Sequence, residues 1–290
     1  MEQAGMRKDN LWKKAFRKFC RDRIGIAALG IVATYAIIAI GADQQLWATG
    51  WDEVYVEDGR VPPSAEFPFG TNNIGQDVYQ RAIFSTKTAF QVGLLVAVLA
   101  TLLGAIAGCI SGFFSGKWLD EAVLWLMGCI DCIPFYLFVA AVGYAFRESD
   151  YAMHIAMVST FWTGSARFVR GEVIKLKHFE FVEAARAIGV PSFLIMFKHI
   201  LPNTTHILLV QATITFVSAI KSEVILSFLG LGVKDGISWG LMIAEASQEV
   251  SAGEYNNFLA ASGFLFVLVM AFNLFSDSLQ DALDPKKVSA

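Results

Sequence analysis

The 290-residue sequence has few charged residues and few cysteines. Charged residues make up 17% of it, whereas an ordinary soluble domain has about 25%. Hydrophobic residues make up 55%, and the mean hydropathy is +0.52. Three of the four cysteines, Cys109, Cys129 and Cys132, lie inside apolar runs, which argues against the disulfide framework of a small secreted protein. These shortages argue against a soluble globular domain and favour an integral membrane protein.

The sequence also lacks a nucleotide-binding loop and a catalytic pair. The nearest fragment, GFFSGKW, lacks the first glycine of a phosphate-binding loop and has Trp118 where a hydroxyl residue would bind magnesium. His154 and Ser165 are eleven residues apart, which is about 16 Å along a helix, too far for a nucleophile and its base. We therefore predict that this chain is not an enzyme and that any ATP chemistry lies on another chain.

Six apolar runs are long enough to cross a membrane. A helix of about 20 apolar residues matches the ~30 Å hydrocarbon layer and satisfies its own backbone groups there. The runs are Ile24–Ala42, Thr88–Phe114, Leu119–Phe146, Tyr151–Val169, Thr204–Leu229 and Phe258–Leu279. The sequence predicts an all-α integral membrane protein with six transmembrane helices.

Basic residues predict how these helices are oriented. An even number of spans places both termini on one side. With the termini in the cytoplasm, the inner segments carry 17 Lys and Arg residues and the outer segments carry five. This bias favours an N-in, C-in orientation. Eight basic residues precede the first run, and we interpret that run as a retained anchor rather than a cleaved signal. Segments 43–87 and 230–257 then face outward, and 170–203 faces the cytoplasm.

The inward segment has the pattern of a helical hairpin. From His178 to Ile188 apolar residues recur every third position, opposite a charged stripe, which predicts an amphipathic helix. The apolar residues are Phe179, Val182, Ala185 and Ile188. Gly189 is expected to cap this helix, and a second short helix is expected from Ser192 to Ile200. Leu201 and Pro202 should end it, and Asn203 or Thr204 should cap the next span. On pattern alone, an interfacial helix resting on lipid headgroups and a docking surface for a cytoplasmic protein both remain open.

Five segments carry a resemblance to a known family. Glu183, Ala184, Ala185, Gly189, Leu201 and Pro202 match the EAA loop pattern of permease subunits in bacterial ABC importers. GTNNIGQDVYQR, 70–81, resembles the GTDxxGRDxxSR segment of the dipeptide, oligopeptide and nickel branch, with Asn72 and Gln76 in place of the Asp and Arg. Four residues fit the end of that branch's fourth span: Trp162, Ala166, Arg167 and Arg170. LSFLGLG, 226–232, with Trp239, Gly240 and Met242, resembles its outer loop, and NLFSDSLQDALDP, 273–285, resembles its C-terminal end. The resemblance begins near residue 67.

The resemblance implies a type I ABC importer permease fold, with a basic N-terminus and first helix in 1–66 and the permease domain in 67–290. It implies that the 183–189 region is a coupling helix that sits on a cytoplasmic ATPase, and that residues 170–203 form the coupling loop. The implied partners are a second homologous permease subunit, two cytoplasmic ABC ATPase subunits and an extracytoplasmic substrate-binding protein. ATP and magnesium would bind the partner subunits, so this chain is expected to bind no cofactor or metal, and no nucleic acid is expected. The implied location is the bacterial inner membrane, as a multi-pass protein. Peptides are the expected substrate class, with nickel chelates and other small solutes as alternatives.

Asp131 lies near the middle of the predicted third span, where an unpaired charge costs at least about 2.5 kcal/mol. It is a candidate for the translocation path or for gating, and a fixed contact between helices is an equal alternative. Pro134 removes the hydrogen bond to the carbonyl of Ile130, so we expect a kink beside Asp131. An ion-coupled secondary carrier is the alternative function, with Asp131 as its one clear candidate for an ionisable site.

The predicted fifth span also contains polar residues. They are candidates for lining the path, although hydrogen bonding between helices explains them equally well. These candidates are Gln211, Thr213, Thr215 and Ser218. Lys221 and Glu223 follow about 26 Å from the start of the span, where both side chains are expected to extend to the outer headgroups.

Overall fold

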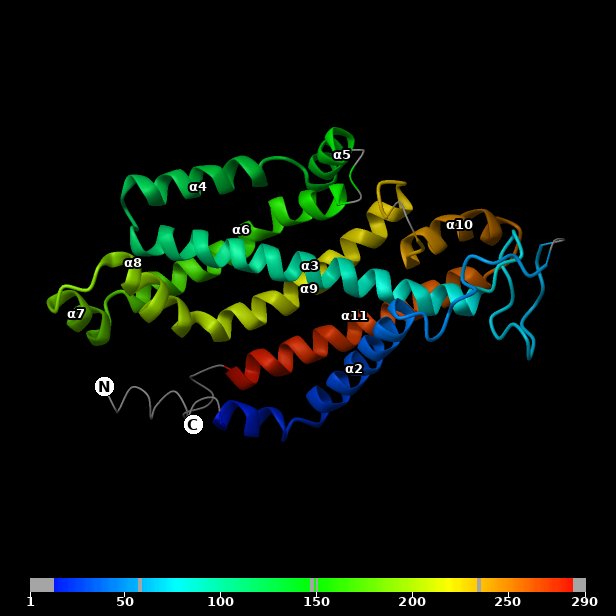
Figure 1. Ribbon diagram of the computed structural model, residues 1–290, viewed down its shortest axis with the longest axis horizontal. Coiled ribbons are helices and arrows are strands. Elements are labelled where there is room, and N and C mark those ends of the chain that lie inside the picture. The colour runs from blue at the N-terminus through cyan, green and yellow to red at the C-terminus, as the bar shows by residue number, and fades with distance from the viewer. Residues whose placement is uncertain (1–12, 57–58, 147–148, 150, 234–235, 284–290) are drawn as a thin grey trace. The chain divides into compact units, whose positions relative to one another are not determined.

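The computed structural model describes residues 13–56, 59–146, 149, 151–233 and 236–283. Its named elements are helical (Figure 1). They are α2 (Arg23–Asp43), α3 (Val78–Phe113), α4 (Trp118–Asp131), α5 (Phe135–Ala145), α6 (Ala152–Leu176), α7 (Glu180–Ala187), α8 (Ser192–Leu194), the π-helix η1 (Ile195–Ile200), the 3₁₀ helix η2 (Leu201–Thr204), α9 (Thr205–Phe228), α10 (Trp239–Ser251) and α11 (Asn256–Leu283). The chain divides into two compact units, one formed by 1–92 and 220–290 and the other by 93–219. Because the divisions fall inside α3 and α9, each of these helices contributes residues to both units.

Four helical stretches among the described residues are long and apolar enough to cross a membrane. They are Arg23–Asp43, Val78–Phe113, Ser192–Phe228 and Asn256–Leu283. The pair α4 and α5, bent by 90°, makes a fifth candidate if it is counted as one span. Helix α6 covers the predicted fourth run from Ala152 onward, but it is less apolar than the four stretches named above. Several hydroxyl residues, His154 and Arg167 make it more polar. The helical membrane character is thus confirmed, and the count of six remains a prediction.

The second predicted span begins earlier than expected. Helix α3 starts at Val78 rather than Thr88, and it has 36 residues. The carboxylate of Asp77 accepts a hydrogen bond from the backbone N–H of Tyr79 at 2.8 Å, as a helix N-cap does. A local cap therefore extends the helix over polar residues that a hydropathy boundary excludes.

The predicted third span is broken. Helix α4 ends at Asp131, α5 begins at Phe135, and the bend between them is 90°. This confirms the kink predicted from Pro134, and the predicted span Leu119–Phe146 consists of two helices. The proline ring also clashes with the carbonyl of the residue one turn earlier, which explains why the helix is interrupted here rather than curved.

Within the first unit, α2 and α11 lie side by side, and α10 packs against α11 (Figure 1). The Tyr35 hydroxyl donates a hydrogen bond to the backbone carbonyl of Phe264 at 3.0 Å. Trp239, at the start of α10, is buried, and its indole N–H donates to the carbonyl of Ala82. Much of the other face of α2 is apolar and exposed, including Ile24, Ile37 and Ile40, as expected for a helix in contact with lipid.

Glu223 contradicts its predicted position. Its side chain does not extend to the headgroups but is 1% exposed inside the first unit. Its carboxylate accepts a hydrogen bond from the Ser227 hydroxyl one turn later at 2.5 Å. Lys221 is exposed, as predicted. The Ser227 hydroxyl thus compensates part of the cost of burying the Glu223 carboxylate. The position of Glu223 along the helix, on which the prediction rested, does not show that such a partner is present.

In the second unit, three glycines let α3 approach α6 closely. Gly104, Gly108 and Gly112 are spaced four residues apart and occupy one face of α3. A Cβ atom at Gly108 would lie 2.4 Å from the carbonyl oxygen of Ala166, and one at Gly112 would lie 2.8 Å from that of Arg170. Any larger side chain would therefore separate the two helices, as at other small-residue interfaces of membrane helices.

Candidate functional site

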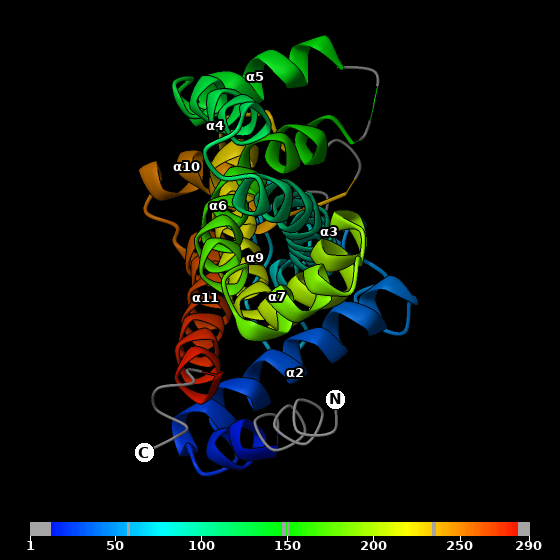
Figure 2. The ribbon, with the colours of Figure 1, turned by 90° about the vertical axis from the view of Figure 1, so that its left-hand side faces the viewer.

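The hairpin, residues 178–203, lies at the end of α6 in the second unit, and Figure 2 looks onto its helix α7. Helix α7 spans Glu180–Ala187, within two residues of the predicted segment. The second arm begins at Ser192 as predicted. However, Leu201 and Pro202 do not end it, because the chain continues through the 3₁₀ turn Leu201–Thr204 into α9.

Two predictions about the end of the hairpin were wrong for one reason. Pro202 lies in the first turn of a 3₁₀ helix, where its missing N–H is tolerated. Asn203 and Thr204 cap no helix with their side chains. Instead the Asn203 amide donates to the carbonyl of His199 and the Thr204 hydroxyl donates to that of Leu201. The change from π to 3₁₀ geometry absorbs the proline without ending the helical stretch.

The turn at Gly189 is a Schellman motif. The N–H of Gly189 donates to the carbonyl of Arg186, and the N–H of Val190 donates to that of Ala185, both at 3.0 Å. Gly189 has a φ of +80°, and an added Cβ would meet no atom within 4 Å. This confirms the predicted glycine cap. The glycine is required by its backbone conformation and not by crowding.

Helix α7 has one buried face and one exposed face. Val182 and Ala185 are buried, as the predicted apolar stripe requires, but Phe179 and Ile188 are 52% and 81% exposed. Glu183 and Ala184 are also exposed. The prediction of an apolar stripe was therefore only partly correct, since its first and last residues, Phe179 and Ile188, are exposed. Phe193 and Leu194, at the start of the second arm, are also exposed, at 65% and 45%, so both arms of the hairpin carry exposed apolar side chains.

The buried face of the hairpin belongs to a core shared with α3 and α6. This core comprises Cys109, Val169, Val173, Leu176, Val182, Ala185, Ile195, Met196 and Ile200. The guanidinium of Arg186 also lies over the ring of Phe113, 5.4 Å from its centroid. Since a dense apolar core resists deformation, the hairpin and the adjoining ends of α3 and α6 form one packed block.

A polar cluster lies beside this core. The buried carboxylate of Asp120 accepts two hydrogen bonds from Arg170, from Nε at 2.8 Å and from Nη2 at 2.9 Å. It also accepts the Ser111 hydroxyl at 2.5 Å and the N–H of Gly116 at 3.0 Å. Lys177 donates to the Ser115 hydroxyl at 2.5 Å. Burial lowers the pKa of the Lys177 ammonium from its usual range, and the nearby charge of Arg186 lowers it further.

Sequence reasoning did not predict the pair Asp120 and Arg170. One signal was present, because Asp120 and Asp131 are eleven residues apart, close to three helical turns, and so share a face of α4. Arg167 and Arg170 similarly share a face of α6. Two acids facing two bases on adjacent helices could have indicated the pairing.

Asp131 contacts α6. Its carboxylate forms an ion pair with Arg167 and accepts a hydrogen bond from the Thr163 hydroxyl at 3.1 Å. The side chains of Asp131 and Arg167 are 34% and 55% exposed. The carboxylate is therefore paired, but on a half-open surface next to the bend between α4 and α5.

The polar residues of α9 differ in their burial. Gln211 and Thr215 are buried one turn apart, and Ser218 is half-buried. The Thr213 hydroxyl donates to the carbonyl of Val210 in its own helix. Their role in a path stays a prediction.

In the first unit, the 70–81 segment is joined to α10. Where the resemblance led us to expect an Asp and an Arg, the amide of Asn72 donates to the side-chain oxygen of Gln76 at 3.1 Å. Arg81 contacts the same oxygen of Gln76 and forms an ion pair with Glu245 at 2.6 Å. A neutral pair of amides therefore occupies this place and remains hydrogen-bonded to a buried arginine.

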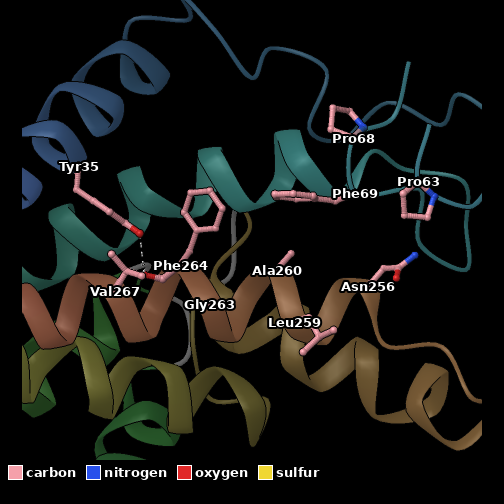
Figure 3. Close-up of a pocket in the computed structure, with 10 residues that line it drawn as sticks. All are labelled: Tyr35, Pro63, Pro68, Phe69, Asn256, Leu259, Ala260, Gly263, Phe264 and Val267. Carbon is pink, nitrogen blue, oxygen red and sulfur yellow. Dashed lines mark hydrogen bonds between the residues drawn. The ribbon is translucent and has the colours of Figure 1, made fainter. Parts of the chain in front are cut away.

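A cavity of about 460 Å³ lies in the first unit between α11, α2 and the 63–69 segment (Figure 3). Its lining is mostly apolar, with Phe69, Leu259 and Val267 among the side chains. Figure 3 shows the Tyr35 hydroxyl directed to the carbonyl of Phe264, which uses its one proton. This lining lacks the convergent polar groups typical of a small-molecule site. The hairpin is the better candidate for a functional site.

Comparison with known proteins gives a consistent result. Residues 100–289 match the family described as binding-protein-dependent transport system inner membrane component. The chain is 36% identical over 279 residues to the oligopeptide transport system permease protein OppC of Salmonella typhimurium, covering 96% of this chain and 92% of that protein. It is 35% identical over 286 residues to OppC of Escherichia coli strain K12, with the same coverage. It is 32% identical over 284 residues to the dipeptide transport system permease protein DppC of Alkalihalophilus pseudofirmus, covering 96% of this chain and 91% of that protein.

Proposed function

Because the chain belongs to the family of binding-protein-dependent transport system inner membrane components, in the peptide branch of the ABC importer permeases, we propose that it forms part of the translocation path of an ATP-driven peptide importer. The observation that carries the proposal is the hairpin. It presents an exposed apolar surface on a helix that is capped rigidly and packed into the helical core. A surface that must bind a moving partner and transmit its movement requires both features.

We propose six spans in an N-in, C-in orientation in the bacterial inner membrane, with the permease domain in residues 67–290. Helix α6 would be the fourth span, protected from lipid by its neighbours. Its close contact with the glycines of α3 supports this, because a polar helix is tolerated in a membrane when its polar side chains face other helices. The hairpin is then cytoplasmic.

Two cytoplasmic ABC ATPase subunits are the proposed partners of the importer, one of them at the hairpin. Glu183, Ala184, Ala185 and Gly189 would set the shape of the docking helix, and Leu201 with Pro202 would set how the second arm enters α9. Exposed Phe179 and Ile188 flank α7, whose exposed face also carries Glu180 and Glu183. This mixture of apolar and acidic side chains suits a cleft in a folded partner better than lipid headgroups. ATP and magnesium would bind those subunits.

A second permease subunit is the proposed partner in the membrane. Helix α4 has two buried residues, Asp120 and Met127, and leaves Trp118 and Trp125 more than 70% exposed. An exposed face of α4 next to the half-exposed ion pair of Asp131 and Arg167 suits a contact with a second permease subunit, with the translocation path enclosed between the two subunits. An extracytoplasmic binding protein would deliver the substrate, and peptides are the proposed class because the relatives named above are peptide permeases.

The test is reconstitution. The chain is purified in complex with the proposed second permease subunit and the two proposed ATPase subunits and placed in lipid vesicles with the proposed binding protein. We expect uptake of radiolabelled trialanine that requires ATP and persists when an ionophore dissipates the proton gradient. Uptake driven by a proton gradient without ATPase subunits would instead favour the ion-coupled carrier and would contradict the proposal.

A further inference from the structure

Helix α4 is joined to α6 by two very different ion pairs. Near its start, the Asp120 side chain is 4% exposed and accepts four hydrogen bonds. At its end, the Asp131 side chain is 34% exposed and is bound by Arg167 and Thr163. The two arginines are only three residues apart on α6, yet they reach acids eleven residues apart on α4. The first pair is enclosed and the second is open to its surroundings.

The enclosed pair joins three separate pieces of chain. Ser111 belongs to α3, Gly116 to the turn before α4, and Arg170 to α6. Gly112 packs against the backbone carbonyl of Arg170, so the helices that provide these donors are themselves in contact. Both oxygens of the Asp120 carboxylate are fully used, and the bidentate geometry with Arg170 fixes its orientation.

The same block holds the hairpin. Val169 and Val173, on either side of Arg170 in sequence, belong to the core that contains Val182 and Ala185 of α7. Lys177, where α6 ends, holds the turn before α4 through Ser115. A displacement of α7 is therefore transmitted through the apolar core to the end of α6, where Arg170 lies.

We propose that the ion pair of Asp120 and Arg170 is the joint through which movement of the hairpin reaches α4. This inference rests on the proposed function. The middle and end of α4 are packed against α6 by Met127, with Val123 and Ile130 beside it, in a cluster with Trp162 and Ala166. The bidentate pair attaches the start of α4, the end that lies beside the core of the hairpin. Asp120 and Arg170 are positioning residues: they touch neither ATP nor peptide, and they make α4, the bend after it and α5 move with the hairpin.

The first measurement is the ratio of trialanine uptake to ATP hydrolysis in the reconstituted complex. For D120N we expect ATP hydrolysis to persist and this ratio to fall about tenfold, the factor that corresponds to losing charge-assisted hydrogen bonds. R170K keeps the charge without the bidentate geometry and should give a smaller loss. The matched control is E121Q, the same chemical change at the next residue, where the side chain is exposed. A ratio for D120N equal to that of E121Q would overturn the joint.

A second measurement does not depend on transport or on the yield of the variant. Spin labels are attached at exposed positions of α4 and of the hairpin, A122C and K198C, with the exposed Cys20, Cys129 and Cys132 replaced by alanine. We expect the distance between the labels to stay constant when ATP hydrolysis is trapped with vanadate, because both positions lie on one block. In D120N the distance should shift or broaden under the same trap. A shift in the Asp120 protein, or none in D120N, would contradict the proposal.

The two proposals fail in different ways. If the complex with the unaltered chain takes up no peptide with ATP, the proposed function fails and the joint fails with it. If that complex is active and D120N behaves as E121Q does in both measurements, the joint alone fails.

Discussion

At Gly189 one residue determines the shape of the proposed docking helix. Its φ of +80° belongs to the left-handed region, where a residue with a Cβ is disfavoured by about 1–2 kcal/mol. No atom lies within 4 Å of the position of an added Cβ, so a substitution would strain the backbone without a steric clash. We expect G189V to reach the membrane in normal amount but to lose substrate-stimulated ATP hydrolysis and uptake, because the hairpin turn would change direction. Membrane quantity and stimulated ATPase activity of the complex measure this.

The chain offers a matched control for that experiment at Gly253. Helix α10 ends in the same motif: the N–H of Gly253 donates to the carbonyl of Val250, and the N–H of Glu254 donates to the carbonyl of Glu249. Gly253 has a φ of +86°, and an added Cβ would meet no atom within 4 Å. G253V therefore introduces equal strain outside the hairpin and should leave ATPase stimulation largely intact. Normal uptake by G189V, or an equal loss in G253V, would count against a special role of the hairpin turn.

The pair of Asp131 and Arg167 allows its structural and functional roles to be separated. The Asn side chain in D131N has the shape of Asp, and its amide oxygen can still accept hydrogen bonds from Arg167 and Thr163, so we expect D131N to change the melting temperature of the complex little. If the pair opens during transport, D131N should nonetheless change the rate of trialanine uptake several-fold. In a double-mutant cycle with R167Q, the effect on uptake should then be strongly non-additive. Wild-type uptake by D131N would identify a fixed contact between α4 and α6.

Residue types could be predicted more reliably than their partners. The sequence singled out Asp131 because a carboxylate in an apolar run is costly, but it could not decide between a path and a fixed contact. That choice depends on α6, a helix distant in sequence, which places Arg167 beside it. Glu223 was misplaced for the same reason, because height along a helix says nothing about which neighbour shields a side chain. Asp120 was missed altogether, since one carboxylate near the start of a span looks like an ordinary interfacial charge.

At the scale of elements, the contact between α3 and α6 depends on glycine. We expect G108A to destabilise the protein by about 1–3 kcal/mol, as overpacking does, because the new methyl group would lie 2.4 Å from the carbonyl oxygen of Ala166. G164A, on the facing helix α6, places a methyl group where no atom lies within 4 Å. That control should be neutral or more stable by up to about 1 kcal/mol through helix propensity. Thermal unfolding in detergent checks both, and an equal effect of the two changes would contradict the close contact.

Helices were easier to predict than their ends. Long apolar runs identified most of the long helices because hydropathy and length depend on many residues at once. The ends depend on single groups: Asp77 extends α3 by a turn-forming hydrogen bond, and Pro202 fails to stop a helix that has changed to 3₁₀ geometry. The break at Pro134 was predictable because a proline inside an apolar run removes a hydrogen bond wherever it stands.

At the scale of the whole molecule, the proposal requires the hairpin and the N-terminus on one side of the membrane. Accessibility to a maleimide that does not cross membranes tests this, in a chain where Cys129 and Cys132 are replaced by serine. Cys20 and a cysteine introduced as I188C are both exposed on the protein, as is one introduced as Y255C in the loop before α11. In spheroplasts we expect Y255C to be labelled, and Cys20 and I188C to be labelled only after permeabilisation. The excess of Lys and Arg on the inner segments is the physical reason, because basic residues near the ends of a span resist translocation.

The three sites together make the outcome decisive. One crossing, α9, separates Ile188 from Tyr255, so these two sites should lie on opposite sides of the membrane. Cys20 and Ile188 lie on the same side if α2, α3, the α4–α5 pair and α6 all cross it, because four crossings then separate them. If I188C is labelled from outside while Cys20 is protected, either the α4–α5 pair or α6 does not span, the count of six is wrong, and the hairpin cannot contact a cytoplasmic ATPase. If all three reverse together, the topology is intact but inverted. Protection of Cys20 and I188C with labelling of Y255C is the one pattern in which the hairpin can receive movement from an ATP-hydrolysing partner.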